Sequence, residues 1–180
     1  MLAYKAFEPG LVCRGYQFKM GLNTTDKANC AKNGFHCAAN PLDCLSYYRD
    51  MGCAEYYLVN AGGDIDEDNS DSKIACTELT IIKKLSREEF FLHGLAYASD
   101  HPLLKWSSHV SKERAEARCG YAVVRGIDPI AKGNVGDIIA LAKEEPHTQK
   151  IVELAVTRID GEKTRAGIWY GVDLHERHVT

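Results

Sequence analysis

The sequence has few of the features that usually reveal what a chain does. No segment reaches the roughly 18 consecutive apolar residues of a transmembrane helix. The 22 Lys and Arg do not exceed the 25 Asp and Glu, so a broad basic surface for nucleic acid is not expected. Neither G-x-S-x-G nor G-x-x-x-x-G-K-[ST] occurs. Serine-hydrolase and P-loop chemistry are therefore not predicted.

Short cysteine pairs are also missing, although seven cysteines are present. Cys30, Cys37 and Cys44 lie seven residues apart, which is wider than the close pairs of a structural zinc site, so no metal is expected. An odd number of cysteines behind an N-terminus without a signal-peptide pattern predicts reduced thiols. We therefore expect a cytoplasmic protein with no membrane association.

The hydrophobic content of 45% is enough for a folded core. Residues 40–52 begin with Asn-Pro, which predicts a helix start, and 86–99 begin with a Ser-x-x-Glu capping box. We predict an α+β fold: a mixed or antiparallel sheet with two main helices, followed by a C-terminal antiparallel β-meander. The expected divisions are a core domain at 1–100, a connecting segment with a short polar helix at 101–120, and the meander, packed on the core, at 121–180.

Three strands are predicted in the C-terminal part, over 138–142, 151–159 and 167–172. Residues 146–149 are the expected turn between the first two, and Asp160-Gly161 marks the expected second hairpin turn. These signals define the antiparallel meander.

Two polar residues stand out on strands predicted in the first half. In a strand over 12–19, Arg14 shares an otherwise apolar face, where it either forms a structural ion pair or faces a ligand. His36 stands between small residues that leave space around its ring, so it is either a hydrogen-bonded structural histidine or part of a pocket. The ligand hypothesis requires both side chains to open into one hollow.

An acidic, turn-rich loop is predicted over 61–72. Its aspartates match the first, third and fifth positions of an EF-hand loop, but Asn69 replaces the glycine and Ala75 the final glutamate. A solvated loop is therefore predicted in place of a calcium site. Its negative charge would complement a basic partner surface. The predicted contact residues are Asp64, Asp66, Glu67 and Asp68.

Several blocks of sequence carry a family resemblance. They are Tyr4-Lys5-Ala6-Phe7, Cys13-Arg14-Gly15-Tyr16-Gln17-Phe18, Gly34-Phe35-His36, Asn40-Pro41-Leu42-Asp43, Asp160-Gly161 and Trp169-Tyr170. With these blocks the chain resembles a family of bacteriophage- and prophage-borne proteins of unknown function. The resemblance implies a binding protein that inhibits a host bacterial factor, such as a CRISPR effector or another defence component, by protein–protein contact and without direct binding to nucleic acid.

The order of an Arg14 strand, a Gly-aromatic-His-Cys strand and a helix with Tyr47-Tyr48 is also similar to the core of ADP-ribosyltransferases. This second resemblance implies NAD as cofactor, with Lys5 or Arg14 as the early residue, and Glu78 as the catalytic candidate that stabilises a cationic transition state. The implied ligand-binding residues are Arg14, Gln17, His36 and Tyr47. A transferase, or a protein that binds a nucleotide in the same cleft without turnover, is the alternative to the inhibitor.

Overall fold

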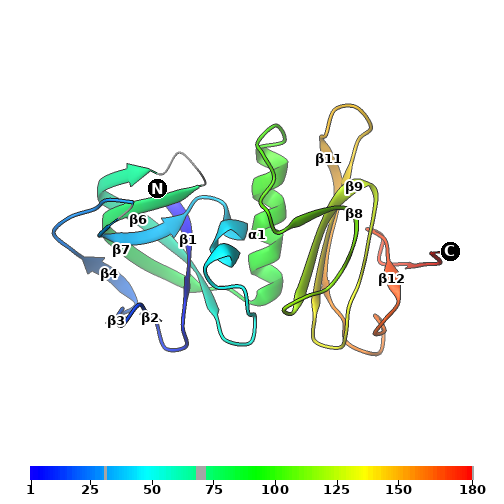
Figure 1. Cartoon of the computed structure of the whole chain (residues 1–180), viewed down its shortest axis with the longest axis horizontal. Coiled ribbons are helices and arrows are strands. Elements are labelled where there is room, and N and C mark those ends of the chain that lie inside the picture. The colour runs from blue at the N-terminus through cyan, green and yellow to red at the C-terminus, as the bar shows by residue number, and fades with distance from the viewer. Residues whose placement is uncertain (31, 68–71, 180) are drawn as a thin grey trace. The chain divides into compact units, whose positions relative to one another are not determined.

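The computed structural model describes residues 1–30, 32–67 and 72–179 (Figure 1). It divides into two compact units, Met1–Ser86 and Arg87–Thr180. Both are rich in β-strands, and most strand pairs are antiparallel, so the chain has a β-rich α+β fold. None of the helices in the described ranges combines the length and apolar character needed to cross a membrane.

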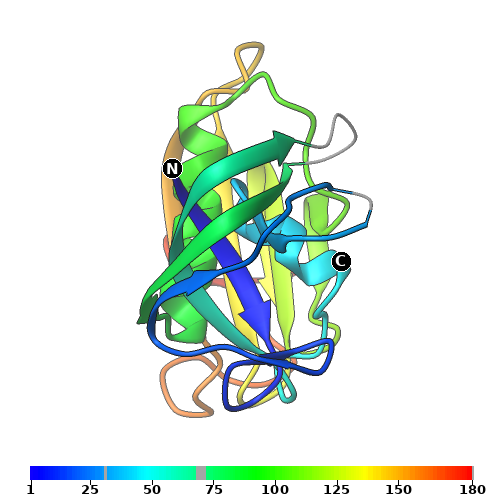
Figure 2. The same cartoon turned by 90° about the vertical axis from the view of Figure 1, so that its left-hand side faces the viewer.

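The first unit is built on strands that close into a ring. β1 pairs with β5 and β6, and β7 pairs with the same two strands and with β4, all antiparallel. Figure 2, in which this unit faces the viewer, shows the long β6–β7 hairpin around β1. The elements are β1 (Leu2–Phe7), β2 (Val12–Cys13), β3 (Tyr16–Gln17), β4 (Gly21–Thr24), β5 (Phe35–Ala38), the 3-10 helix η1 (Pro41–Ser46), β6 (Glu55–Glu67) and β7 (Lys73–Lys84).

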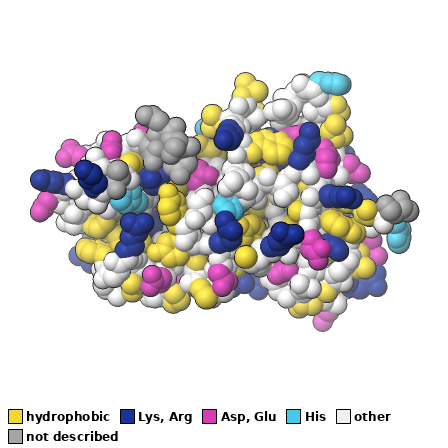
Figure 3. Space-filling model, viewed as in Figure 1, with side chains coloured by type: hydrophobic (Ala, Val, Ile, Leu, Met, Phe, Trp, Pro, Cys, Tyr) yellow, Lys and Arg dark blue, Asp and Glu magenta, His cyan; other side chains and the backbone are white. Residues whose placement is uncertain are grey.

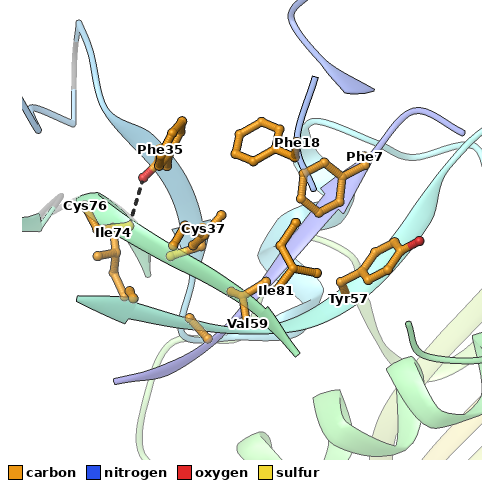
Figure 4. Close-up of a cluster of buried hydrophobic side chains, with 12 residues drawn as sticks. Phe7, Phe18, Phe35, Cys37, Tyr57, Val59, Ile74, Cys76 and Ile81 are labelled. Atoms are coloured by element: carbon orange, nitrogen blue, oxygen red, sulfur yellow. Dashed lines mark hydrogen bonds between the residues drawn. The ribbon is translucent and has the colours of Figure 1, made fainter. Parts of the chain in front are cut away.

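Aromatic side chains form the centre of this unit. The Phe7 ring centroid lies 5.1 Å from that of Phe18 and 5.4 Å from that of Tyr57, both edge-on (Figure 4). Because side chains alternate along a strand, Lys5 lies on the same side of β1 as Ala3 and Phe7. Its side chain is consequently carried toward the core, and the residue is only 5% exposed.

The strand predicted over 12–19 is wrong in one respect, because a hairpin turn interrupts it. Val12 pairs with Gln17 and Cys13 with Tyr16, so Arg14 and Gly15 form a two-residue loop. Their φ angles are 50° and 76°, the positive values that a type I′ turn requires at both positions. Arg14 therefore does not share a strand face with its apolar neighbours.

The predicted helix start at Asn40 is confirmed, but the element is short. The Asn40 Oδ1 atom accepts a hydrogen bond from the Leu42 N–H at 3.1 Å, and Pro41 opens the helix. The amides of Tyr47 and Tyr48 both bond to the Cys44 carbonyl, which closes a 3-10 segment of six residues. Two main helices are thus not present in the described chain, where α1 (Arg87–Asp100) is the one α-helix.

The second unit contains α1 and a six-stranded sheet. Its strands run in the order β11-β10-β9-β12-β13, with β8 also paired to β9. α1 packs against β10 and β11, so the division of the chain falls before this helix, whereas the sequence placed it after residue 100. The strands are β8 (Val110–Glu116), β9 (Tyr121–Lys132), β10 (Ile138–Glu144), β11 (Ile151–Arg158), β12 (Trp169–Tyr170) and β13 (Glu176–Arg177).

The prediction of an antiparallel C-terminal meander is wrong except for its first hairpin. β10 and β11 are antiparallel as expected, but β12 pairs with β9, and β8–β9 and β9–β10 are parallel. The pairing register shifts between Lys112 and Arg114, where Glu113 has a φ of 62°. Residues 117–120 and 133–137 connect these parallel strands.

A short polar helix was expected between residues 101 and 120, but Val110–Glu116 is a strand. Lys112, Arg114 and Glu116 are exposed and alternate with half-buried residues, one of which is the fourth charged residue, Glu113. That spacing of two matches the side-chain period of a strand. Lys112, Arg114 and Glu116 therefore form the solvent-exposed face of a strand.

Candidate ligand-binding pocket

The first unit contains a cavity of about 560 Å³, within the size range of small-molecule sites. β1, the β2–β3 hairpin, β5 and η1 contribute to its walls. Arg14, His36 and Tyr47 all line it, so the structure brings three of the predicted ligand-binding residues to one hollow. Lys5, the alternative early residue, lines it as well.

The lining is basic although the chain as a whole carries a net charge of −3. Its cationic side chains are Lys5, Arg14, Lys32 and Lys73. Asp43 is the one acidic residue among the described residues of the wall, and its Oδ2 atom accepts a hydrogen bond from Ser72 Oγ at 2.7 Å. Figure 3 shows basic, acidic and histidine side chains beside hydrophobic ones on the visible face of this unit, so the excess of positive charge is a property of the pocket lining. The pocket therefore has the charge of an anion site.

Arg14 occupies an unfavourable backbone position for its residue type. Type I′ turns favour Asn, Asp or Gly at this position, and a left-handed φ costs other residues about 1 kcal/mol. Its side chain is exposed and, within the described part of the chain, makes no hydrogen bond or ion pair. The structural ion pair considered for Arg14 is thus not formed there, and its guanidinium is available to a ligand.

Lys5 provides a positive charge at a buried point of the wall. Its Nζ atom donates to the His36 carbonyl oxygen at 2.6 Å and to Cys13 Sγ at 3.7 Å. The same atom lies 5.2 Å and 5.3 Å from the ring centroids of Phe7 and Phe18. No carboxylate of the described residues pairs with it. A buried ammonium without a counter-charge is costly, so an anion entering the pocket would stabilise it.

The His36 imidazole adds an unused polar atom. Its Nε2 is buried and has no hydrogen-bond partner within the described structure. Burial lowers the pKa of His36 below its usual value, and the positive charge of Lys5 lowers it further. The ring is therefore held neutral near pH 7, and its Nε2 leaves one hydrogen bond unused in the described structure.

Tyr48 and Cys13 form a second contact in the wall, which the sequence did not indicate. The Tyr48 hydroxyl donates to Cys13 Sγ at 3.3 Å. Burial raises the pKa of Tyr48, and its hydrogen bond with Cys13 acts in the same direction. The missed signal was the Cys-x-Gly-Tyr turn of the β2–β3 hairpin, from which Cys13 contacts Tyr48, two residues beyond η1.

Aromatic side chains provide the apolar part of the pocket. The Tyr16 ring centroid lies 4.6 Å from that of Phe18 and 5.3 Å from that of Phe35. Tyr16 and Tyr47 are 47% and 55% exposed, so they present ring surface to solvent as well as to the cavity. Such rings can stack on a flat heterocycle.

Gln17 and Glu78, which were also predicted as site residues, do not line the pocket. The Gln17 amide donates to the carbonyl oxygens of Gly10 and Phe18 at 2.8 Å and 2.9 Å, so it holds the hairpin in place. Glu78 is exposed on β7, paired with Thr24 and Gly62, and does not line the pocket. The catalytic set implied by the transferase resemblance is therefore not brought together.

Three of the predicted acidic contact residues, Asp64, Asp66 and Glu67, lie at the end of β6. Residues 61–67 continue this strand, so the predicted loop is wrong over that part. Asp64 and Glu67 are exposed, whereas Asp66 Oδ2 accepts a hydrogen bond from the Cys30 N–H at 2.8 Å. Asp68 lies outside the described residues. Within residues 1–30, 32–67 and 72–179, no group of three or more acidic, cysteine or histidine side chains forms a metal site.

One protein family matches the chain. The family described as "Domain of unknown function (DUF7666)" matches residues 1–93. The match includes the whole first unit, with the pocket, and the first turns of α1. Neither a curated protein nor a solved structure matches the sequence.

Proposed function

We propose that this chain, which belongs to the family described as Domain of unknown function (DUF7666), binds a nucleotide in the pocket of its first unit without turning it over. The observation that carries the proposal is the buried Lys5 ammonium, which faces a cavity and has no carboxylate partner in the described chain. A phosphate or another anionic group would supply the missing negative charge.

The exposed cations give the ligand its second point of attachment. Arg14 and Lys32 are both exposed members of the wall and can contact phosphate oxygens without the cost of burying a free charge. Tyr16, Phe35 and Tyr47 offer ring surface for a base. A ligand with both an anionic and an aromatic part, such as NAD, ADP-ribose or ATP, fits this combination.

Binding without turnover is favoured by the position of the carboxylates. Glu78 is not part of the wall, and the one described acidic residue in it, Asp43, accepts hydrogen bonds from both the N–H and the hydroxyl of Ser72. A phage origin and inhibition of a host defence protein through Asp64, Asp66, Glu67 and Asp68 stay predictions from the sequence. They would be tested by capture of a host protein and its loss on charge reversal at Asp64 and Glu67, which are exposed.

The experiment is a calorimetric titration of the full chain with NAD, ADP-ribose, ATP and inorganic phosphate. We expect the nucleotides to bind more tightly than phosphate alone, and Arg14→Ala to weaken their binding about tenfold, the effect of one charge-assisted hydrogen bond. Arg49→Ala is the matched control, because Arg49 is an exposed arginine of the same unit outside the wall.

Equal binding by the two arginine variants, or no binding of any nucleotide, would contradict the proposal. Turnover is checked separately by following NAD for release of nicotinamide. Loss of NAD that stops in the Glu78→Gln variant would favour the transferase alternative.

A further inference from the structure

One cluster in the pocket wall contains a thiol to which the proposed nucleotide binding gives no role. It consists of the Cys13 thiol, the Lys5 ammonium and the Tyr48 hydroxyl. Cys13 is partly exposed and lines the cavity, so a molecule in the pocket can reach its sulfur. Cys53 and Cys119 are more exposed but lie outside the wall, which makes Cys13 chemically distinct from them.

Two hydrogen-bond donors converge on this sulfur from different elements. Lys5 Nζ, on β1, lies 3.7 Å from Sγ, and Tyr48 Oη, just beyond η1, lies 3.3 Å from it. Sulfur is also the one side-chain acceptor of the Lys5 ammonium in the described structure, since the other contact is a main-chain carbonyl. Both donors stabilise the negative charge that sulfur carries when it attacks an electrophile or leaves in the reverse reaction.

We propose that Cys13 is a site of thiol–disulfide exchange with anionic disulfides that enter this pocket. The Cys13 thiol gives up its proton to solvent as its sulfur attacks one sulfur of the disulfide. A new S–S bond to Cys13 forms, the original S–S bond breaks, and half of the reagent departs as a thiolate. The thiol is oxidised and the departing half is reduced, so the disulfide itself is the oxidant.

The positive charge of the pocket wall should make Cys13 react preferentially with negatively charged disulfides. Arg14 and Lys32 lie in the wall together with Lys5, and they raise the local concentration of anions near Cys13. This part of the inference rests on the anion-binding character of the proposed function. The reactivity of the sulfur itself depends on Lys5 and Tyr48 and does not require that the natural ligand be a nucleotide.

Cys30 provides a comparison within the same pocket. It also lines the wall, but its Sγ donates to the Asp66 carbonyl oxygen at 2.8 Å and lies 3.7 Å from the Lys73 carbonyl oxygen. Carbonyl oxygens oppose negative charge on sulfur, whereas an ammonium supports it. Cys13 should therefore react faster than Cys30, although the two are similarly accessible.

The test uses the full chain with Cys53→Ser and Cys119→Ser, which removes the two exposed thiols. Its reaction with dithiobis(nitrobenzoate), a dianionic aromatic disulfide, is compared with that of neutral dithiodipyridine, by absorbance and peptide mass mapping. We expect one fast thiol, absent after Cys13→Ser. Arg14→Ala should slow only the anionic reagent, about threefold, and Arg49→Ala neither.

The sulfur contacts are tested by two further variants. Lys5→Met should slow both reagents about tenfold and Tyr48→Phe about threefold, because each removes a donor to the developing charge. Tyr48→Phe loses only a hydroxyl, so it keeps the test decisive if Lys5→Met does not fold. Reaction of Cys13 no faster than Cys30, or the same anion preference in both arginine variants, would overturn the inference.

Nucleotide binding is measured on the same Cys53→Ser, Cys119→Ser background. If nucleotides fail to bind while Cys13 still prefers the anionic disulfide, the inference stands and the nucleotide proposal fails. If nucleotides bind but Cys13 is unreactive, the inference alone fails.

Discussion

The Lys5 ammonium lies 2.6 Å from the main-chain oxygen of His36, and this short contact joins β1 to β5 at the wall of the pocket. The donor is 5% exposed and charged, while the acceptor is neutral. One carbonyl offsets only part of the desolvation of an ammonium. This imbalance makes the free protein less stable than it could be, and it is what an anionic ligand would correct.

Replacement of Lys5 by Met should therefore change protein stability and nucleotide binding in opposite directions. Met has a similar length and no charge, so we expect the free energy of unfolding of the ligand-free protein to rise by about 1 kcal/mol, while nucleotide binding weakens. Urea denaturation followed by circular dichroism measures the first effect and calorimetry the second. Lys19→Met, at an exposed position of the same unit, is the control and should change stability little. A clear loss of stability in Lys5→Met would mean that the ammonium is a structural group.

At the β2–β3 turn, Arg14 should likewise lower the stability of the free protein while it strengthens nucleotide binding. Arg14→Asn places the residue that type I′ turns prefer at a φ of 50°, so we expect a gain of about 0.5 kcal/mol in the free energy of unfolding. The same change removes the guanidinium from the pocket and should weaken nucleotide binding about tenfold. Thermal denaturation with and without nucleotide measures both. Stability that falls in Arg14→Asn, with binding unchanged, would contradict the role given to this residue.

The sequence predicts this structure best where a feature depends on residues that are close together along the chain. The start of η1 at Asn40 and the β10–β11 hairpin were predicted correctly because each depends on neighbouring residues. The hairpin turn at Arg14-Gly15 was missed because an arginine is uncommon where φ is positive. The sequence therefore gave Arg14 a strand face that it does not have.

Non-local pairing was the larger source of error. β8 pairs with β9 and β9 with β10 in parallel, and β8 shifts register at Glu113; alternation of polar and apolar residues indicates neither feature. The same limit applies to the site. Arg14 and His36 were singled out one at a time, whereas the contact between Cys13 and Tyr48 exists only after the β2–β3 hairpin folds back.

The lowered pKa of His36 predicts a pH dependence of stability. Because the folded protein favours the neutral His36 imidazole, this residue binds fewer protons in the folded protein than in the unfolded chain. The free energy of unfolding therefore rises with pH. The contribution is complete above 6.5, the usual pKa of a histidine, and is lost as the pH falls from there through the lower pKa of the folded protein. The free energy of unfolding of the natural protein minus that of His36→Gln should therefore decrease as the pH is lowered below about 6.5. A difference that stays constant between about pH 8 and pH 5 would contradict the prediction.

A buried ion pair in the second unit gives a prediction independent of the pocket. Arg125 on β9 and Glu144 on β10 are 2% and 8% exposed, their charged atoms approach to 2.6 Å, and the guanidinium lies 4.4 Å from the Trp106 ring centroid. Removing one charge leaves the other buried and unpaired, so Glu144→Gln and Arg125→Met should each lower the free energy of unfolding by about 3 kcal/mol.

The double variant Arg125→Met/Glu144→Gln should lose much less than the sum of the two single losses, because it leaves no unpaired charge. Chemical denaturation of the four proteins, with the same buffer and the same probe, completes the double-mutant cycle. Additive losses would show that the two residues act separately and that the observed contact contributes no coupling. A strongly stabilising coupling would instead show that the ion pair helps to hold β9 against β10. These two strands pair in parallel, with Arg125 opposite Ala142.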